Sequence, residues 1–315
     1  MNEYLKIYEV GPRDGLQNEA VLVPTEDKKR IIDGLILAGL PSIELTSFVH
    51  PKAVPQMADA DEIMAATLAK HGLEQRQFTG LVFNERGYDR ALASGCKAIA
   101  IGAAVSDSFS RANAGMSSKE AVVKVRKLIS WARRDNIWVR IYISTAWVCP
   151  FDGPIRPEAT IAYAEELWAA GPPDELSIAD TIGFANPLDV GLLMEQLGKR
   201  LDMSKLAVHL HDTQAMGLAN TTAAIQAGIR IHDSSVGGLG GCPFAPGAAG
   251  NLATEDLVFL AYKLNLGTGV DFAALWDVVA DVEEIVGRRV GGRIRDWWES
   301  EGRVSTEGPQ IPAPF

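Results

Sequence analysis

Two histidines, His209 and His211, stand two positions apart in the otherwise apolar run LAVHLHD. In a β-strand successive side chains point to opposite faces, so both imidazoles would project to one face while Leu210 and Asp212 project to the other. Imidazoles on adjacent pleats can bind a single metal ion. The spacing also fits two hydrogen-bonded core histidines or coincidence, so the pair alone suggests a metal site without establishing one.

A charged pair, Arg13 and Asp14, directly follows the first apolar run, in the segment YEVGPRDGLQNE. An arginine can stabilise a developing oxyanion, and a carboxylate can bind a divalent cation. An isolated RDG sequence is more often a surface turn with a local salt bridge, and this alternative stays open.

Carboxylates occupy comparable positions on two further apolar runs, with Glu44 inside SIELTS and Asp180 at the end of ELSIAD. Each of them, taken alone, is more often a capping or solvated residue than a catalytic group. If these runs are strands of one barrel, Asp14, Glu44, Asp180 and the two histidines converge on one end of the fold. That convergence, and no single residue, indicates a functional site.

A glycine-rich segment, SSVGGLGGCPFAPGAAGN, surrounds Cys242. Such a loop can approach a ligand closely and can move between open and closed states. A glycine-rich phosphate cradle and a plain long turn are alternatives. A single cysteine is structural or inert in most proteins.

The elements that must position these residues alternate between β-rich and helical runs. Eight strand–helix units predict an α/β fold of the (β/α)8 barrel type, the TIM barrel. A doubly wound open sheet is the alternative, and the barrel is favoured because the polar residues cluster at the carboxyl ends of the strands. The predicted strands are residues 5–10, 42–48, 78–83, 98–104, 138–145, 175–180, 206–212 and 230–238.

Two further helical stretches, residues 254–266 and 271–287, follow the eighth strand. No Pro/Ser linker divides the chain. We therefore predict one catalytic barrel domain with extra C-terminal helices over residues 1–300. A Pro-rich tail, residues 301–315, is expected to be extended or disordered.

The composition excludes several function classes. A net charge of −10 without a dense Lys/Arg cluster argues against nucleic-acid binding. No window approaches 18 consecutive apolar residues, so we expect no membrane span. Three cysteines without close spacing argue against a disulfide framework. The N-terminal residues lack the pattern of a secretory or transit sequence, so a cytoplasmic location is expected.

Several motifs together resemble the 3-hydroxy-3-methylglutaryl-CoA lyase family: VGPRDGLQNE, IELTSFVHPKAVPQM, DTIGFANP, HLHDT and DSSVGGLGGCPFAPGAAGNLATEDLV. The resemblance runs over nearly the whole chain in the expected order, and SVGGLGGCPF is its most specific part. It implies cleavage of 3-hydroxy-3-methylglutaryl-CoA to acetyl-CoA and acetoacetate by a retro-aldol (retro-Claisen) reaction that depends on a divalent metal. It also suggests a homodimer and a role in leucine degradation.

The resemblance further implies roles for individual residues. It implies Asp14, His209, His211 and Asn251 as metal ligands. It implies catalytic roles for Arg13, Glu44, Asp180, His209 and Cys242, with Gln17 and Arg13 contacting the substrate. Arg13 would stabilise the thioester enolate and Cys242 would protonate it, whereas the general base is left open. The mixed ligand set suits Mg²⁺ or Mn²⁺, and Zn²⁺ or Co²⁺ stays possible.

Some positions depart from the family pattern, all on loops predicted at the active end. The segments HDTQAMGLAN and STAWVCPFDG differ from it, Phe151 and Phe244 replace tyrosines, and Asp107 replaces a glutamate. The acyl group is therefore open, with 3-hydroxy-3-isohexenylglutaryl-CoA and citramalyl-CoA as alternative substrates. A condensing synthase of the same superfamily and a non-enzymatic barrel are weaker alternatives. The synthase would lack the cysteine-bearing loop, and the non-enzymatic barrel predicts loss of catalytic residues.

Overall fold

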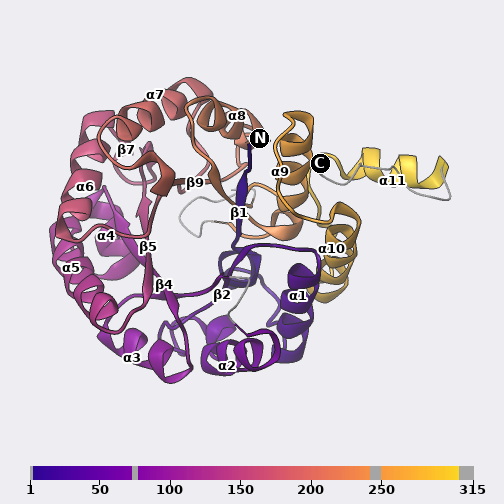
Figure 1. Cartoon of the computed structure of the whole chain (residues 1–315), viewed down its shortest axis with the longest axis horizontal. Helices are drawn as coiled ribbons and strands as arrows, with labels where there is room; N and C mark the ends of the chain where they lie inside the picture. The colour runs from indigo at the N-terminus through magenta and orange to yellow at the C-terminus, as the bar shows by residue number, and fades with distance from the viewer. Residues whose placement is uncertain (1–2, 73–76, 242–249, 305–315) are drawn as a thin grey trace.

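The computed structural model, which describes residues 3–72, 77–241 and 250–304, is built on a closed barrel of parallel strands. Around the barrel the strands follow the order β1, β10, β9, β8, β5, β4, β3 and β2, so the predicted TIM barrel is confirmed (Figure 1). The strands are β1 (Lys6–Glu9), β2 (Ser42–Ser47), β3 (Gln77–Val82), β4 (Ala98–Ala104), β5 (Trp138–Ser144), β8 (Glu175–Asp180), β9 (Leu206–Leu210) and β10 (Ile231–Ser234).

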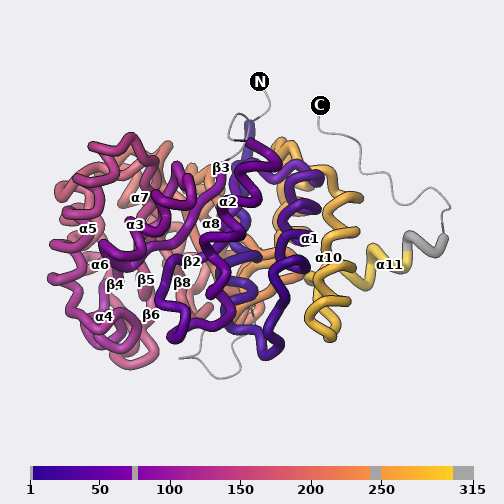
Figure 2. The backbone as a smooth tube through the Cα atoms, turned by 90° about the horizontal axis from the view of Figure 1, so that it is seen from below, coloured from indigo at the N-terminus to yellow at the C-terminus, as the bar shows by residue number. Residues whose placement is uncertain are grey.

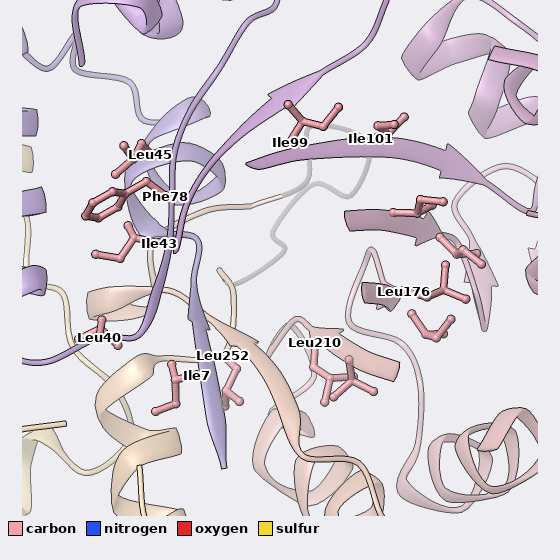
Figure 3. Close-up of a cluster of buried hydrophobic side chains, with 14 of the residues drawn as sticks. Ile7, Leu40, Ile43, Leu45, Phe78, Ile99, Ile101, Leu176, Leu210 and Leu252 are labelled. Atoms are coloured by element: carbon pink, nitrogen blue, oxygen red, sulfur yellow. The ribbon is translucent and has the colours of Figure 1, made fainter. Parts of the chain in front are cut away.

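Strand alternation divides the side chains of the barrel into two sets. Aliphatic side chains such as Ile99 and Ile101 of β4 lie on the outer face, where they are fully buried against the helices (Figure 3). The alternate positions face the barrel interior, and many of them are polar or charged, including Arg140 and Tyr142 of β5. A barrel interior is usually packed with layers of aliphatic side chains, so the polar side chains inside this barrel indicate a functional role for its interior.

Helices surround the barrel on its outside (Figures 1 and 2). None of the helices in the described part of the chain is long and apolar enough to cross a membrane. The helices are α1 (Thr25–Leu37), α2 (Ala60–His71), α3 (Glu85–Ala93), α4 (Asp107–Ala114), α5 (Ser118–Arg134), α6 (Pro157–Ala170), α7 (Pro187–Gly198), α8 (Gly217–Gln226), α9 (Thr254–Lys263), α10 (Phe272–Val286) and α11 (Arg295–Val304).

Several elements were not predicted from the sequence. They include a π-helix (Gly11–Gly15), helix α4, the hairpin of β6 (Val148–Cys149) and β7 (Gly153–Pro154), helix α11 and three 3-10 turns. Helix α4 and the hairpin lie in loops at the carboxyl ends of β4 and β5, and their short sequences carry little periodic signal.

Helix α11 projects away from the ring of helices in both views (Figures 1 and 2). Its base is fixed by Trp298, whose ring stacks on Trp276 of α10 at a centroid distance of 5.8 Å. The helix runs to Val304, past the boundary at residue 300 that the sequence suggested, and residues 305–315 lie outside the described residues.

Glu9, on the outer face of β1, fixes the start of the π-helix. Its Oε1 accepts hydrogen bonds from the backbone N–H groups of Gly11 (2.7 Å) and Val236 (2.9 Å), and its Oε2 accepts one from the Thr254 hydroxyl (2.6 Å). Burial raises the pKa of Glu9 to about 7, although these hydrogen bonds favour the ionised form. In the protonated form Oε2 can donate to Thr254, whose hydroxyl donates to Ser234 (2.8 Å), so no hydrogen bond is lost.

Glu9→Gln should flatten the pH dependence of stability, because glutamine mimics the protonated carboxyl. Folding raises the pKa of Glu9 from 4.5 to about 7, so the stability it contributes is complete below pH 4.5 and is lost as the pH rises through 7. The free energy of unfolding of E9Q minus that of wild type, measured by urea titration, should rise by roughly 2–3 kcal/mol between pH 5 and pH 8. Burial raises the pKa of Glu255 to about 8, but Glu255 titrates in both proteins, so its effect cancels in this difference. Parallel pH profiles for the two proteins would contradict this account.

Candidate metal and active site

A cavity of about 140 Å³ opens at the carboxyl ends of the barrel strands. Its lining combines polar side chains with apolar ones such as Leu81, Phe83 and Phe109. Five of the site residues proposed from the sequence line this cavity: Arg13, Asp14, Gln17, His209 and His211.

Asp14, His209 and His211 form a compact group of potential metal ligands within this cavity. One ligand atom from each residue lies within 4.8 Å of the others. The Nε2 atoms of both histidines are 3.9 Å from Oδ2 of Asp14. Asp14 comes from the π-helix and the histidines come from β9 and the residue after it, so the elements on either side of β10 in the barrel order supply the group.

Hydrogen bonds at the far side of each ring aim the Nε2 atoms at Asp14. Nδ1 of His211 donates to the backbone carbonyl of Thr181 (2.6 Å), which can only accept. Nδ1 of His209 lies 3.1 Å from Oδ2 of Asp233. Such partners fix the tautomer of a metal-binding histidine and leave its Nε2 lone pair available.

Asn251 joins the group through a backbone bridge to His211. Its Nδ2 donates to Oδ2 of Asp14 (2.9 Å) and to the carbonyl of Leu239 (3.0 Å). Gly240, at φ +108°, lies so close that a Cβ there would be 2.5 Å from Nδ2 of Asn251, and only glycine fits.

Two buried atoms in this group have no hydrogen-bond partner among the described residues: Nε2 of His211 and Oδ1 of Asn251. Buried polar atoms are rarely left without a partner. An imidazole nitrogen, an amide oxygen and a carboxylate are together a donor set that divalent cations accept. The residues present therefore fit a divalent metal ion, as the sequence predicted, and its identity stays open.

Arg13 is held by two carboxylates. Its Nε donates to Oε1 of Glu44 and its Nη1 donates to Oδ1 of Asp14, each at 2.5 Å, while the Tyr142 hydroxyl donates to Oε2 of Glu44 (2.5 Å). Burial lowers the pKa of Arg13, but the charges of Glu44 and Asp14 outweigh burial and raise it above its ordinary value. Burial likewise raises the pKa of Asp14, but the charge of Arg13, together with His209 and His211, outweighs burial, so this pKa lies well below the usual range.

Asp180 does not line the cavity. On β8, Leu176 and Ile178 face outward and belong to the core beneath the helices. Asp180 follows in the same alternation and therefore also faces outward. Its carboxylate accepts hydrogen bonds from the backbone N–H groups of Phe184 (3.1 Å) and Ala185 (3.0 Å). Burial raises the pKa of Asp180, which these N–H groups oppose. Its catalytic role stays a prediction, and its contacts fix the turn after β8.

Cys242 and Phe244 lie outside the described residues, so the catalytic role of Cys242 also stays a prediction. Sequence reasoning missed Tyr142 and Asp233, which contact Glu44 and His209. Both are polar residues at inward positions of buried strands, and strand alternation was the available signal.

Comparisons with known proteins agree with this geometry. The family model described as HMGL-like matches residues 4–282. The chain belongs to the HMGL-like family. The assignment to a carbon–carbon lyase family, made from the motifs, is thereby confirmed.

Relatives of this HMGL-like chain are similar over most of its length. It is 44% identical to the cytoplasmic 3-hydroxy-3-methylglutaryl-CoA lyase of Mus musculus, over 85% of this chain and 77% of that one. It is 42% identical to the hydroxymethylglutaryl-CoA lyase of Pseudomonas mevalonii, over 87% of this chain and 90% of that one. The crystal structure of the Bacillus subtilis HMG-CoA lyase superimposes with a TM-score of 0.90 at 37% identity, covering 94% of this chain and 98% of that one.

The Tyr142–Glu44 contact predicts a difference between two tyrosine variants. Tyr142→Phe leaves an oxygen of a fully buried carboxylate without its donor, and should lower the free energy of unfolding by about 1–3 kcal/mol. Tyr8→Phe is the matched control, because the buried Tyr8 hydroxyl has no hydrogen-bond partner in the described part of the chain. Y8F should leave stability nearly unchanged or raise it. Equal destabilisation of both variants in urea titrations would argue against this reading of Glu44.

Proposed function

We propose that this protein is a divalent-metal-dependent lyase that cleaves 3-hydroxy-3-methylglutaryl-CoA to acetyl-CoA and acetoacetate. The observation that carries the proposal is the group of Asp14, His209 and His211, which lines one cavity together with Arg13 and to which Asn251 is joined by its hydrogen bond to Asp14. The names of relatives more than 40% identical over most of the chain supply the substrate.

Asp14, His209, His211 and Asn251 would hold the metal ion, with Mg²⁺ or Mn²⁺ as the proposed species. When bound, a divalent cation lowers the pKa of a hydroxyl and orients the bond to be broken. Gln17, in the lining of the same cavity, is proposed to contact the substrate.

In the cleavage, the substrate hydroxyl loses its proton and its oxygen becomes the ketone oxygen of acetoacetate. The electron pair of the broken carbon–carbon bond moves onto the acetyl thioester as an enolate, which takes up a proton to give acetyl-CoA. The protein must therefore remove one proton, stabilise one negative charge and deliver one proton.

Arg13 is placed to stabilise the negative charge. Its Nε and Nη1 are used by Glu44 and Asp14, whereas Nη2 makes no hydrogen bond to any described residue. That nitrogen is free to donate to the thioester oxygen as charge develops there. Both oxygens of Glu44 are occupied, by Arg13 and by Tyr142, so Glu44 acts by holding the guanidinium rather than by accepting the substrate proton.

Proton delivery to the enolate carbon is proposed for Cys242, and the base that removes the hydroxyl proton is left unassigned. We also propose a homodimer and a part in leucine degradation. A cytoplasmic location is proposed by analogy with the mouse cytoplasmic relative, and a mitochondrial relative of the same organism also matches.

Arg13→Met should lower kcat on 3-hydroxy-3-methylglutaryl-CoA by roughly a hundred- to a thousandfold, because one donor to a developing oxyanion is lost. Arg13→Lys should recover little, since an ammonium cannot reach Glu44, Asp14 and the substrate at once. Acetyl-CoA release measures both variants, and metal binding and circular dichroism control for folding. Full activity in R13M would remove Arg13 from the mechanism.

Wild-type protein should release acetyl-CoA and acetoacetate from the methyl-substituted thioester. A panel that includes 3-hydroxy-3-isohexenylglutaryl-CoA and citramalyl-CoA tests the acyl group. Turnover of a longer thioester without turnover of the methyl substrate would overturn the substrate assignment and leave the reaction class intact.

Chelation should abolish activity, and added Mn²⁺ should restore it. His211→Ala should weaken Mn²⁺ binding at least about tenfold, because a ligand nitrogen is lost. His71→Ala is the matched control, since His71 contacts only the surface residue Asp33 among ionic partners and should leave binding unchanged. Counting free Mn²⁺ by electron paramagnetic resonance makes the comparison. Undiminished binding in H211A would refute the ligand assignment.

A further inference from the structure

A chain of charged side chains runs through the barrel interior beneath the cavity. Lys6 donates to Oε1 of Glu175 (2.5 Å), and Nη1 of Arg140 donates to Oε2 of the same carboxylate (2.7 Å). Nη2 of Arg140 donates to Oδ1 of Asp233. Oδ2 of Asp233 contacts Nδ1 of His209 at 3.1 Å. The chain therefore connects the amino-terminal end of β1 to a proposed metal ligand without a gap.

This arrangement is rigid around Arg140. Its side chain is completely buried, and its Cζ lies 3.8 Å from the centroid of the Tyr8 ring. The guanidinium bridges two carboxylates on different strands, Glu175 on β8 and Asp233 on β10. Its two terminal nitrogens are thus both committed, and Asp233 cannot turn without breaking an ionic hydrogen bond.

Stability alone does not account for these buried charges. Removing two ions from water is costly, and well-packed apolar side chains in place of a buried ion pair are often at least as stable. The two histidines also differ in their hydrogen-bond partners. His211 is oriented by the backbone carbonyl of Thr181, whereas the Nδ1 atom of His209 has the Asp233 carboxylate as its one partner among the described residues. The orientation of His209 therefore depends on side chains that are themselves held by Arg140.

We propose that Arg140 and Asp233 are positioning residues that fix the ring orientation and the tautomer of His209. Arg140 holds Asp233 so that its carboxylate accepts the Nδ1 proton of His209. Nε2 then keeps its lone pair toward Asp14, where the proposed function requires a cation. The inference rests on the proposed metal site for its consequence, but the tautomer of His209 can be read without metal.

The geometry predicts that a harmful change at Asp233 is suppressed by a second change at Arg140. In Asp233→Asn, Arg140 can only donate, so the amide oxygen must face Arg140 and the NH2 group must face His209. His209 then accepts at Nδ1 and carries its proton on Nε2. In the double variant R140M/D233N the donor at Oδ1 is gone, and the Ser177 hydroxyl, which donates to Oδ2 of Asp233 (3.3 Å), remains on the His209 side. The amide can then turn its oxygen to Ser177 and His209 and restore the Nδ1–H tautomer.

The test measures Mn²⁺ binding by electron paramagnetic resonance and the His209 tautomer by ¹H–¹⁵N spectra of metal-free protein. D233N should bind Mn²⁺ about tenfold or more weakly than wild type, and R140M/D233N should recover most of that loss. R140M/D233L, which is equally charge-balanced but cannot orient the ring, should stay about tenfold weaker. Lys6→Met, at the far end of the chain, should leave both readouts unchanged because Arg140 keeps both carboxylates.

The proposal is overturned if R140M/D233N binds no better than R140M/D233L, or if D233N keeps the wild-type tautomer. The two double variants decide the matter even if D233N alone does not fold, since they contain no excess buried charge. Wild-type protein that binds no Mn²⁺ would refute the proposed metal site. The metal-free spectra would then still test the positioning of His209.

Discussion

A closed barrel excludes water from its interior, so every charge that points inward must find its partner on another strand. This constraint organises the molecule. One chain of ion pairs starts at the amino-terminal end of the strands and joins, in this order, Lys6, Glu175, Arg140 and Asp233, and Asp233 contacts His209. A second chain crosses the upper barrel from Tyr142 through Glu44 and Arg13 to Asp14.

The two chains meet at the cavity, where Nε2 of His209 lies 3.9 Å from Oδ2 of Asp14. At this junction the local pairing is incomplete, because Nε2 of His211 and Oδ1 of Asn251 find no partner in the described residues. Two unpaired buried acceptors close to the Asp14 carboxylate favour a positive charge at the junction. The charged groups of the two chains are otherwise paired with one another, so the unpaired acceptors beside an ionised carboxylate lie at this junction.

The sequence predicted the barrel and several polar residues of the cavity lining because those features depend on local periodicity. His209 and His211 are inward-facing by alternation alone, and Arg13 and Asp14 follow the first strand directly. The same alternation places Asp180 on the outer face of the barrel, as it does Leu176 and Ile178. The prediction for Asp180 considered only its position at the end of a strand and overlooked this alternation.

Arg140, Asp233 and Tyr142 were missed because their partners are distant in the chain. Arg140 pairs with Asp233 93 residues away, and Tyr142 pairs with Glu44 98 residues away. A charged residue inside an apolar strand signals that a partner exists, but only the closed order of strands identifies it. The π-helix was missed for a related reason: the three N–H groups of Arg13, Asp14 and Gly15 all donate to the carbonyl of Val10, a pattern without sequence periodicity.

That π-helix explains why Arg13 and Asp14 can serve different purposes although they are adjacent. In a strand, neighbouring residues would point to opposite faces of the barrel wall. The tight turn instead lets both side chains reach the cavity, where they also bond to each other. Glu9 holds this turn from outside the barrel, through the N–H groups of Gly11 and Val236, while Glu44 holds it from inside through Arg13. A short segment gripped on both sides of the wall keeps its donors in place before any ligand arrives, which is the condition for electrostatic stabilisation without reorganisation.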